Sequence, residues 1–146
     1  MHHKIAFLLA WGSGLRISEV VDLKREDIDM DKKTLRVNMG KNSKDRIVPI
    51  PRGFNKDKHM QYIPFDYKDR NIQKAFRLYS EKSGIRTKKP SAHFHSLRHG
   101  FATHCVRKGI NLRSIQQMLG HSDLGTTAIY LQLAPEESLN EYQEKF

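Results

Sequence analysis

Four short stretches of this chain carry side chains suited to chemistry on a phosphodiester. They are Gly14-Leu15-Arg16, His95-Ser96-Leu97-Arg98-His99, Leu119-Gly120-His121 and Thr126-Thr127-Ala128-Ile129-Tyr130. Together they offer two guanidinium groups, imidazoles and a phenol. Guanidinium groups bind and neutralise the oxygens of a phosphate, while a phenol oxygen can attack phosphorus. The set predicts a nucleophilic reaction at a phosphodiester.

Tyr130 is the candidate nucleophile among five tyrosines. A free phenol has a pKa of about 10, so attack requires nearby positive charge and a proton acceptor. Only Tyr130 follows a His-Ser-Asp-x-x-Thr-Thr run, whereas Tyr79 has the spacing of a core residue. We expect His95 to be the base for Tyr130 and His121 to donate to a phosphate oxygen, although the two roles could be exchanged.

The first elements of the chain must position Arg16. Residues 5–11 read as a buried helix of about two turns, ended by Gly12-Ser13-Gly14, and residues 17–23 read as a short amphipathic helix. Arg16 then lies at a turn that opens the second helix. Glu19, one turn further on, can orient Arg16 or a neighbouring donor.

Residues 34–38 and 46–50 are predicted to form a β-hairpin, with Pro49 at an edge or bulge. The lysines of its tip, Lys41 and Lys44, are candidates for the acid that protonates a leaving 5′-oxygen. Lys44 and Arg46 are expected to contact backbone phosphate. Residues 52–68 read as loop or partial strand.

The second half is predicted to be mostly helical. Apolar residues recur on one face between positions 72 and 79, 97 and 106, and 112 and 119, and glycines follow each segment. His95 and Arg98 then project from one turn at a helix start. Asn111 is a candidate cap for the third helix. The expected fold is mainly α with a small antiparallel β-sheet, an α+β class.

Composition sets looser limits. The chain has 146 residues, 26 Lys plus Arg against 16 Asp plus Glu, and a net charge of +10. Its length suits one domain, residues 1–146, and its charge favours a polyanionic partner, although a ribosomal or membrane-surface protein could share it. The single Cys105 excludes an internal disulfide and fits a reducing, cytoplasmic compartment. Neither a membrane span nor a signal peptide is expected.

The four stretches, in this order, resemble the catalytic domain of the tyrosine recombinases, the phage-integrase and Xer-type family. The resemblance covers nearly the whole chain from Gly14 to Tyr130 and aligns the family's hairpin lysine with Lys41. It implies a catalytic set with two supporting residues, Glu19 and His99. The catalytic set is Arg16, Lys41, His95, Arg98, His121 and Tyr130.

The resemblance also implies an activity and its partners. Double-stranded DNA would be cleaved and rejoined through a 3′-phosphotyrosyl intermediate, with no metal or other cofactor, inside a tetramer assembled on DNA. Family members normally carry an N-terminal DNA-clamping domain, which is expected to be absent here, so the free chain is expected to be monomeric. Residues 131–146 form a tail expected to dock in cis or on a partner.

Three alternatives remain. A type IB topoisomerase uses related chemistry but relaxes a single duplex. A non-enzymatic DNA-binding protein would explain the charge but not the combined motifs. A metallo-nuclease could use the histidines at positions 93, 95, 99 and 104, although no third ligand or carboxylate is obvious near the pair at 95 and 99.

Overall fold

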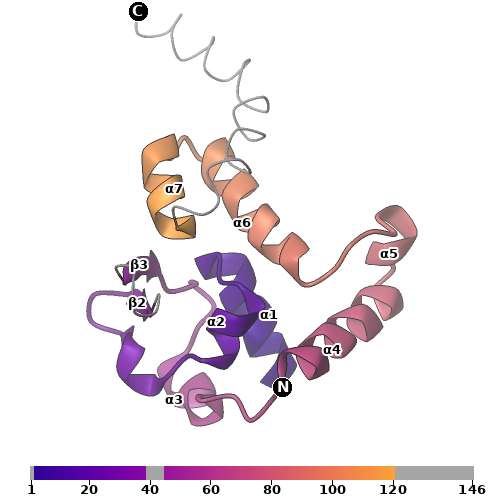
Figure 1. Ribbon diagram of the computed structural model, residues 1–146, viewed down its shortest axis with the longest axis horizontal. Helices are drawn as coiled ribbons and strands as arrows, with labels where there is room; N and C mark the ends of the chain where they lie inside the picture. The colour runs from indigo at the N-terminus through magenta and orange to yellow at the C-terminus, as the bar shows by residue number, and fades with distance from the viewer. Residues whose placement is uncertain (1, 39–44, 121–146) are drawn as a thin grey trace, which may run out of the picture. The chain divides into compact units, whose positions relative to one another are not determined.

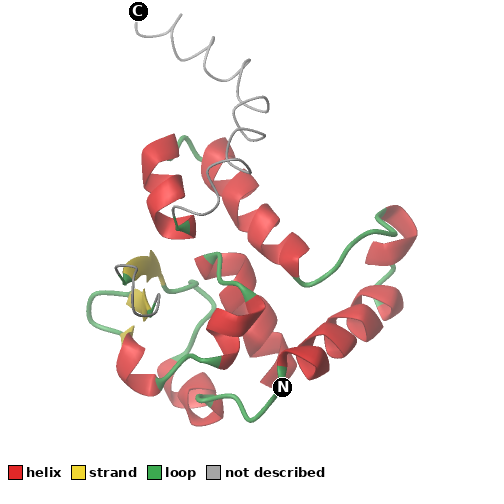
Figure 2. Ribbon diagram, in the orientation of Figure 1, coloured by secondary structure: helices red, strands yellow, loops and turns green. Residues whose placement is uncertain are grey.

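The computed structural model describes residues 2–38 and 45–120, and these are mainly helical with one small sheet (Figures 1 and 2). Internal contacts divide the chain into two compact units, residues 1–101 and 102–146. The expected single domain therefore stays a prediction. The elements are α1 (His2–Ser13), α2 (Ile17–Val21), η1 (Arg25–Asp27), β1 (Ile28–Asp29), β2 (Thr34–Val37), β3 (Arg46–Pro49), α3 (Lys56–His59), η2 (Met60–Tyr62), α4 (Asp69–Lys82), α5 (Ile85–Lys88), α6 (His95–Arg107) and α7 (Leu112–Leu119).

The sheet confirms the predicted hairpin and adds a strand to it. Its order is β1-β2-β3, with both pairs antiparallel, and Val37 pairs with Arg46 at the end of the hairpin nearest its connecting loop. Pro49 lies on β3, an edge strand, where its missing N–H removes no ladder bond. Side chains alternate along β3, so that Arg46 and Val48 are buried while the residues between and after them are exposed.

Helices α1, α2 and α4 of the first unit each bury apolar residues. Ile5 and Leu9 of α1, Val20 of α2 and Ile72 of α4 are almost fully buried and belong to the core. The predicted end of α4 is confirmed, since Gly84 follows it with a φ of 77°. Tyr79 differs from its expected core position, because it is 40% exposed.

Two expectations for the first unit were wrong. The first helix is not a two-turn fragment, because α1 runs for 12 residues. The polar segment 52–68 is not loop or strand alone but contains α3 and η2. Asn55 caps α3, since its side chain accepts a hydrogen bond from the Lys58 N–H at 3.0 Å.

The second unit contains the end of α6 and all of α7. Gly109, with a φ of 73°, follows α6 as expected. The side chain of Asn111 caps α7 by accepting from the Arg113 N–H at 2.8 Å. Ile115 and Leu119 are its buried residues, which agrees with the apolar face expected between positions 112 and 119. None of the helices in residues 2–38 and 45–120 is long and apolar enough to cross a membrane.

Candidate active site

The turn between α1 and α2 is held by α6. Gly14 has a φ of 68°, and a Cβ at this position would lie 2.5 Å from the ring of Phe101. The buried side chain of Arg98 donates from Nη1 to the Gly14 carbonyl at 2.6 Å. Only glycine satisfies both the backbone angle and the close approach of the ring. The predicted glycine turn is thus present, and one candidate arginine fixes the turn that carries the other.

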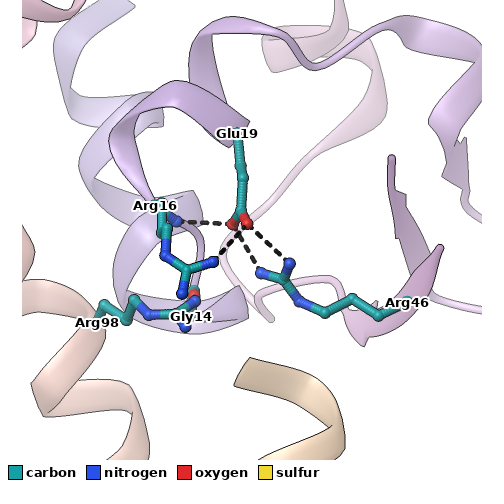
Figure 3. Close-up of polar contacts among 5 residues, drawn as sticks. All are labelled: Gly14, Arg16, Glu19, Arg46 and Arg98. Carbon is teal, nitrogen blue, oxygen red and sulfur yellow. Dashed lines mark hydrogen bonds and ion pairs between the residues drawn. The ribbon is translucent and has the colours of Figure 1, made fainter. Parts of the chain in front are cut away.

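Arg16 is placed by Glu19, as expected. The Glu19 carboxylate accepts from the Arg16 backbone N–H at 2.8 Å and contacts its guanidinium at 3.4 Å. Figure 3 shows the carboxylate lying between the side chains of Arg16 and Arg46. The backbone bond satisfies a free N–H at the start of α2. Glu19 therefore contacts both the backbone and the guanidinium of Arg16.

Arg46 was expected to contact DNA backbone phosphate, but the structure places its side chain inside the fold. Its side chain is 7% exposed, and its Nη1 and Nη2 atoms donate to the two oxygens of Glu19 at 2.7 and 2.6 Å. The physical reason is the alternation of β3, which directs position 46 to the buried face together with Val48. A guanidinium on this face requires a carboxylate partner, and Glu19 supplies it.

The charges around Glu19 keep it ionised. Burial alone would raise the pKa of the Glu19 carboxyl, but the hydrogen bond and positive charge of Arg46, with smaller contributions from the Arg16 N–H and from Arg98, lower it below its ordinary 4.5. The site therefore holds three guanidinium groups around one carboxylate. This excess of positive charge suits an anion.

His95 is the first residue of α6, and His99 lies one turn later. Their rings meet edge to face, with centroids 4.7 Å apart. Burial first, then the positive charge of His99, Arg98, His93 and Arg16, lowers the pKa of His95 below 6.5, and burial together with the charge of His93 and Arg98 lowers the pKa of His99. A neutral imidazole at position 95 can accept a proton.

Arg16 borders two clefts of the first unit. One, of about 500 Å³, is also lined by His95, Gln73 and Phe94, and the other, of about 490 Å³, by Glu19 and Asn38. Because His95 and Arg16 line the same cleft, both can contact one bound group there.

Asp27 is a residue of this region that the sequence analysis missed. Its carboxylate is buried and accepts from the Lys24 N–H at 3.0 Å and from the side chains of Arg36 and Asn38, each at 3.3 Å. It thus ties Arg36 of β2 and Asn38, which follows this strand, to η1. An acidic residue three positions after the start of a helical turn is a capping pattern, which could have indicated it.

Four predicted site residues lie outside the described residues, namely Lys41, Lys44, His121 and Tyr130, as does the tail 131–146. The structure brings together Arg16, Glu19, Arg46, Arg98, His95 and His99. Within residues 2–38 and 45–120, no three His, Cys, Asp or Glu side chains are grouped so that they could hold a metal ion. The metallo-nuclease alternative therefore has no ligand set in this part of the chain.

Comparison with known proteins gives one consistent family. The model of the phage integrase family matches residues 1–63 and 65–137. Tyrosine recombinase XerA of Thermococcus kodakarensis is 36% identical over 159 aligned positions, covering 97% of this chain and 54% of the relative. The chain spans about half the length of the curated relatives it matches.

Solved structures agree with this fold. A crystal structure of XerA recombinase matches with a TM-score of 0.73 and 27% identity, over 99% of this chain and 58% of the other. XerH site-specific recombinase matches with a TM-score of 0.76 over 96% of this chain and 44% of the other, and at 20% identity it supports the fold alone. The expected catalytic-domain fold is confirmed.

Proposed function

Since this chain belongs to the phage integrase family, we propose that it is the catalytic part of a site-specific DNA recombinase that cleaves and rejoins strands through a tyrosine. The observation that carries the proposal is the link between the two candidate arginines. Arg98 donates to the carbonyl of Gly14, two residues before Arg16. Two guanidinium groups held in this way suit the non-bridging oxygens of one phosphate and the charge of its pentacoordinate transition state.

In the proposed reaction the Tyr130 oxygen attacks phosphorus and forms a 3′-phosphotyrosyl bond. The bond from phosphorus to the 5′-oxygen breaks, and Lys41 gives the leaving oxygen a proton, while His95 accepts the phenol proton. The lowered pKa of His95 supports this last role, because the imidazole is neutral at pH 7. His121 donates to a phosphate oxygen. A 5′-hydroxyl of a second strand then reverses the steps, so no ATP or other cofactor is consumed.

The proposed partner is double-stranded DNA, and the proposed working assembly is a tetramer that forms on it from chains that are monomeric when free. The net charge of +10 supports a polyanionic partner. A type IB topoisomerase would need the same phosphate-binding arginines, but the relatives named above are recombinases. The relatives therefore favour strand exchange over relaxation.

The test is capture of the covalent intermediate. Nicked DNA that loses a short fragment after cleavage traps the adduct, which runs as a slow band in a denaturing gel. We expect the band with the wild-type chain and its loss in Tyr130→Phe, which keeps the ring and removes the attacking oxygen. Tyr79→Phe is the matched control, because Tyr79 is a half-exposed residue of α4. An undiminished band from Tyr130→Phe would contradict the proposed nucleophile.

A further inference from the structure

The Glu19 carboxylate is shared unequally between two arginines. Arg46 takes both oxygens at 2.7 and 2.6 Å, and the Arg16 backbone N–H takes one of them at 2.8 Å. The contact with the Arg16 guanidinium is longer, at 3.4 Å. Figure 3 shows this arrangement, with Arg46 approaching the carboxylate from the side away from Arg16. The short contacts therefore go to Arg46 and to the backbone.

Burial separates the two arginines. The side chain of Arg46 is 7% exposed and that of Glu19 11%, whereas the side chain of Arg16 is 29% exposed and borders both clefts. Arg46 itself lines neither cleft. Arg16 is thus the member of this group that a ligand can reach, and Arg46 holds the carboxylate from within the fold.

A carboxylate accepts about four hydrogen bonds, and Glu19 makes four contacts here. Without Arg46, two acceptor positions would be left open beside the guanidinium of Arg16, three residues away on the same helical turn. A two-point pair between Arg16 and Glu19 is then the favourable outcome, because a half-buried carboxylate needs a cation. Such a pair would neutralise Arg16.

We propose that Arg46 is a positioning residue, which occupies both oxygens of Glu19 so that the carboxylate orients the Arg16 backbone and keeps only one longer contact with the Arg16 guanidinium. The proposal rests on the proposed function, in which Arg16 binds the scissile phosphate. It differs from a simple stabilising ion pair in one respect. If Arg46 acts by restraining Glu19, then removal of the charge of Glu19 must relieve the loss of Arg46.

The experiment measures the rate of adduct formation on nicked DNA, with the full chain in saturating excess so that the rate reports the chemical step. Arg46→Met removes the cation at similar length and is expected to slow the step on the order of 100-fold, through misplacement of a transition-state donor. The double variant Glu19→Gln/Arg46→Met is expected to react at least tenfold faster than Arg46→Met. The Gln amide oxygen can still accept a hydrogen bond from the Arg16 N–H. Arg70→Met is the matched control and should react at the wild-type rate, since Arg70 is an exposed arginine of α4 that lines neither cleft.

If circular dichroism shows that Arg46→Met is unfolded, the same comparison is made with Arg46→Lys and with Glu19→Gln/Arg46→Lys. Arg46→Lys keeps the charge but can hold only one oxygen, so we expect an intermediate slowing that Glu19→Gln again relieves. The inference would be overturned by wild-type rates in both Arg46 variants, or by a double variant that reacts no faster than the corresponding Arg46 single variant. In either case the proposed function would still stand if the wild-type chain forms the adduct. Absence of the adduct in the wild-type chain would overturn both.

Discussion

Each of the two candidate arginines is held by contacts within the protein. Arg98 is fixed by the Gly14 carbonyl, and Arg16 by the backbone and side-chain contacts of Glu19. Donors that are held in place before the reaction lose little conformational entropy when a phosphate binds. The role of Gly14 is therefore chemical as well as conformational, because its carbonyl orients one arginine and its turn presents the other.

The histidines give a prediction on stability against pH. Burial, with neighbouring positive charge, lowers the pKa of His95 and His99 in the folded chain below the ordinary 6.5. The unfolded chain then binds protons first as the pH falls, so stability is fully present above about pH 6.5 and is lost progressively below it. Urea unfolding between pH 7.5 and pH 5 should show this loss, and His95→Gln or His99→Gln should reduce it.

The control for this measurement is His104→Gln, an exposed position on the last turn of α6. It should leave the pH dependence as it is in the wild-type chain. A dependence equally steep in His95→Gln, His99→Gln and His104→Gln would show that the histidine cluster is not its source.

Sequence reasoning grouped three residues that the structure places together, and it did not foresee the burial of a fourth, Arg46. Arg16, Glu19 and Arg98 could be grouped because local spacing and motif order apply to them. Arg46 was assigned with Lys44 to contacts with backbone phosphate, although its alternation with the apolar Val48 was visible in the sequence. Which carboxylate meets a buried arginine depends on contacts between residues 27 positions apart, and these are not encoded in any local pattern.

At the scale of elements, α6 contacts the end of α1 where glycines leave space. The ring of Phe101 occupies the position that a Gly14 side chain would take, and Trp11 does the same at Gly100. These approaches bring the start of α6, with His95 and Arg98, beside the turn that carries Arg16. The absence of a side chain at Gly14 and at Gly100 thus allows the turn that carries Arg16 to lie close to the start of α6.

Gly14→Ala is predicted to destabilise the chain by about 2–4 kcal/mol, measured by urea unfolding. Part of this loss is the left-handed backbone angle, and part is the clash with Phe101. Gly84→Ala is the matched control, because its φ of 77° is similar but nothing lies within 4 Å of an added Cβ. It should lose only about 1–2 kcal/mol. Equal losses in the two variants would contradict a packing role for Gly14.

Helices and strands were predicted correctly where the apolar pattern is long or where a glycine or a capping residue marks an end. The ends of α4 and α6 and the start of α7 were marked by Gly84, Gly109 and Asn111, whose backbone or capping preferences are local. The elements missed were η1, β1, α3, η2 and α5, each of two to four residues. Such segments are shorter than the period of any hydrophobic pattern, so tertiary contacts decide them.

At the scale of the whole molecule, charge is unevenly distributed along the sequence. Residues 135–146 contain four Glu and one Lys, a net charge of −3 within a chain of +10. The remainder of the chain therefore carries +13. A DNA backbone attracts residues 1–134 and repels this acidic segment. We therefore expect the tail to bind protein rather than DNA.

Removal of residues 135–146 tests the expected docking of the tail on a neighbouring subunit. The truncated chain should keep a nearly unchanged melting temperature and bind DNA more tightly at low salt, because a repulsive charge is gone. It should form fewer DNA-dependent oligomers in sedimentation, because Leu139, Tyr142 and Phe146 are the apolar residues available for docking. A control with the four tail Glu residues changed to Gln keeps those apolar residues. It should gain DNA affinity yet still assemble, and equal assembly by the truncated chain would exclude a docking role for the tail.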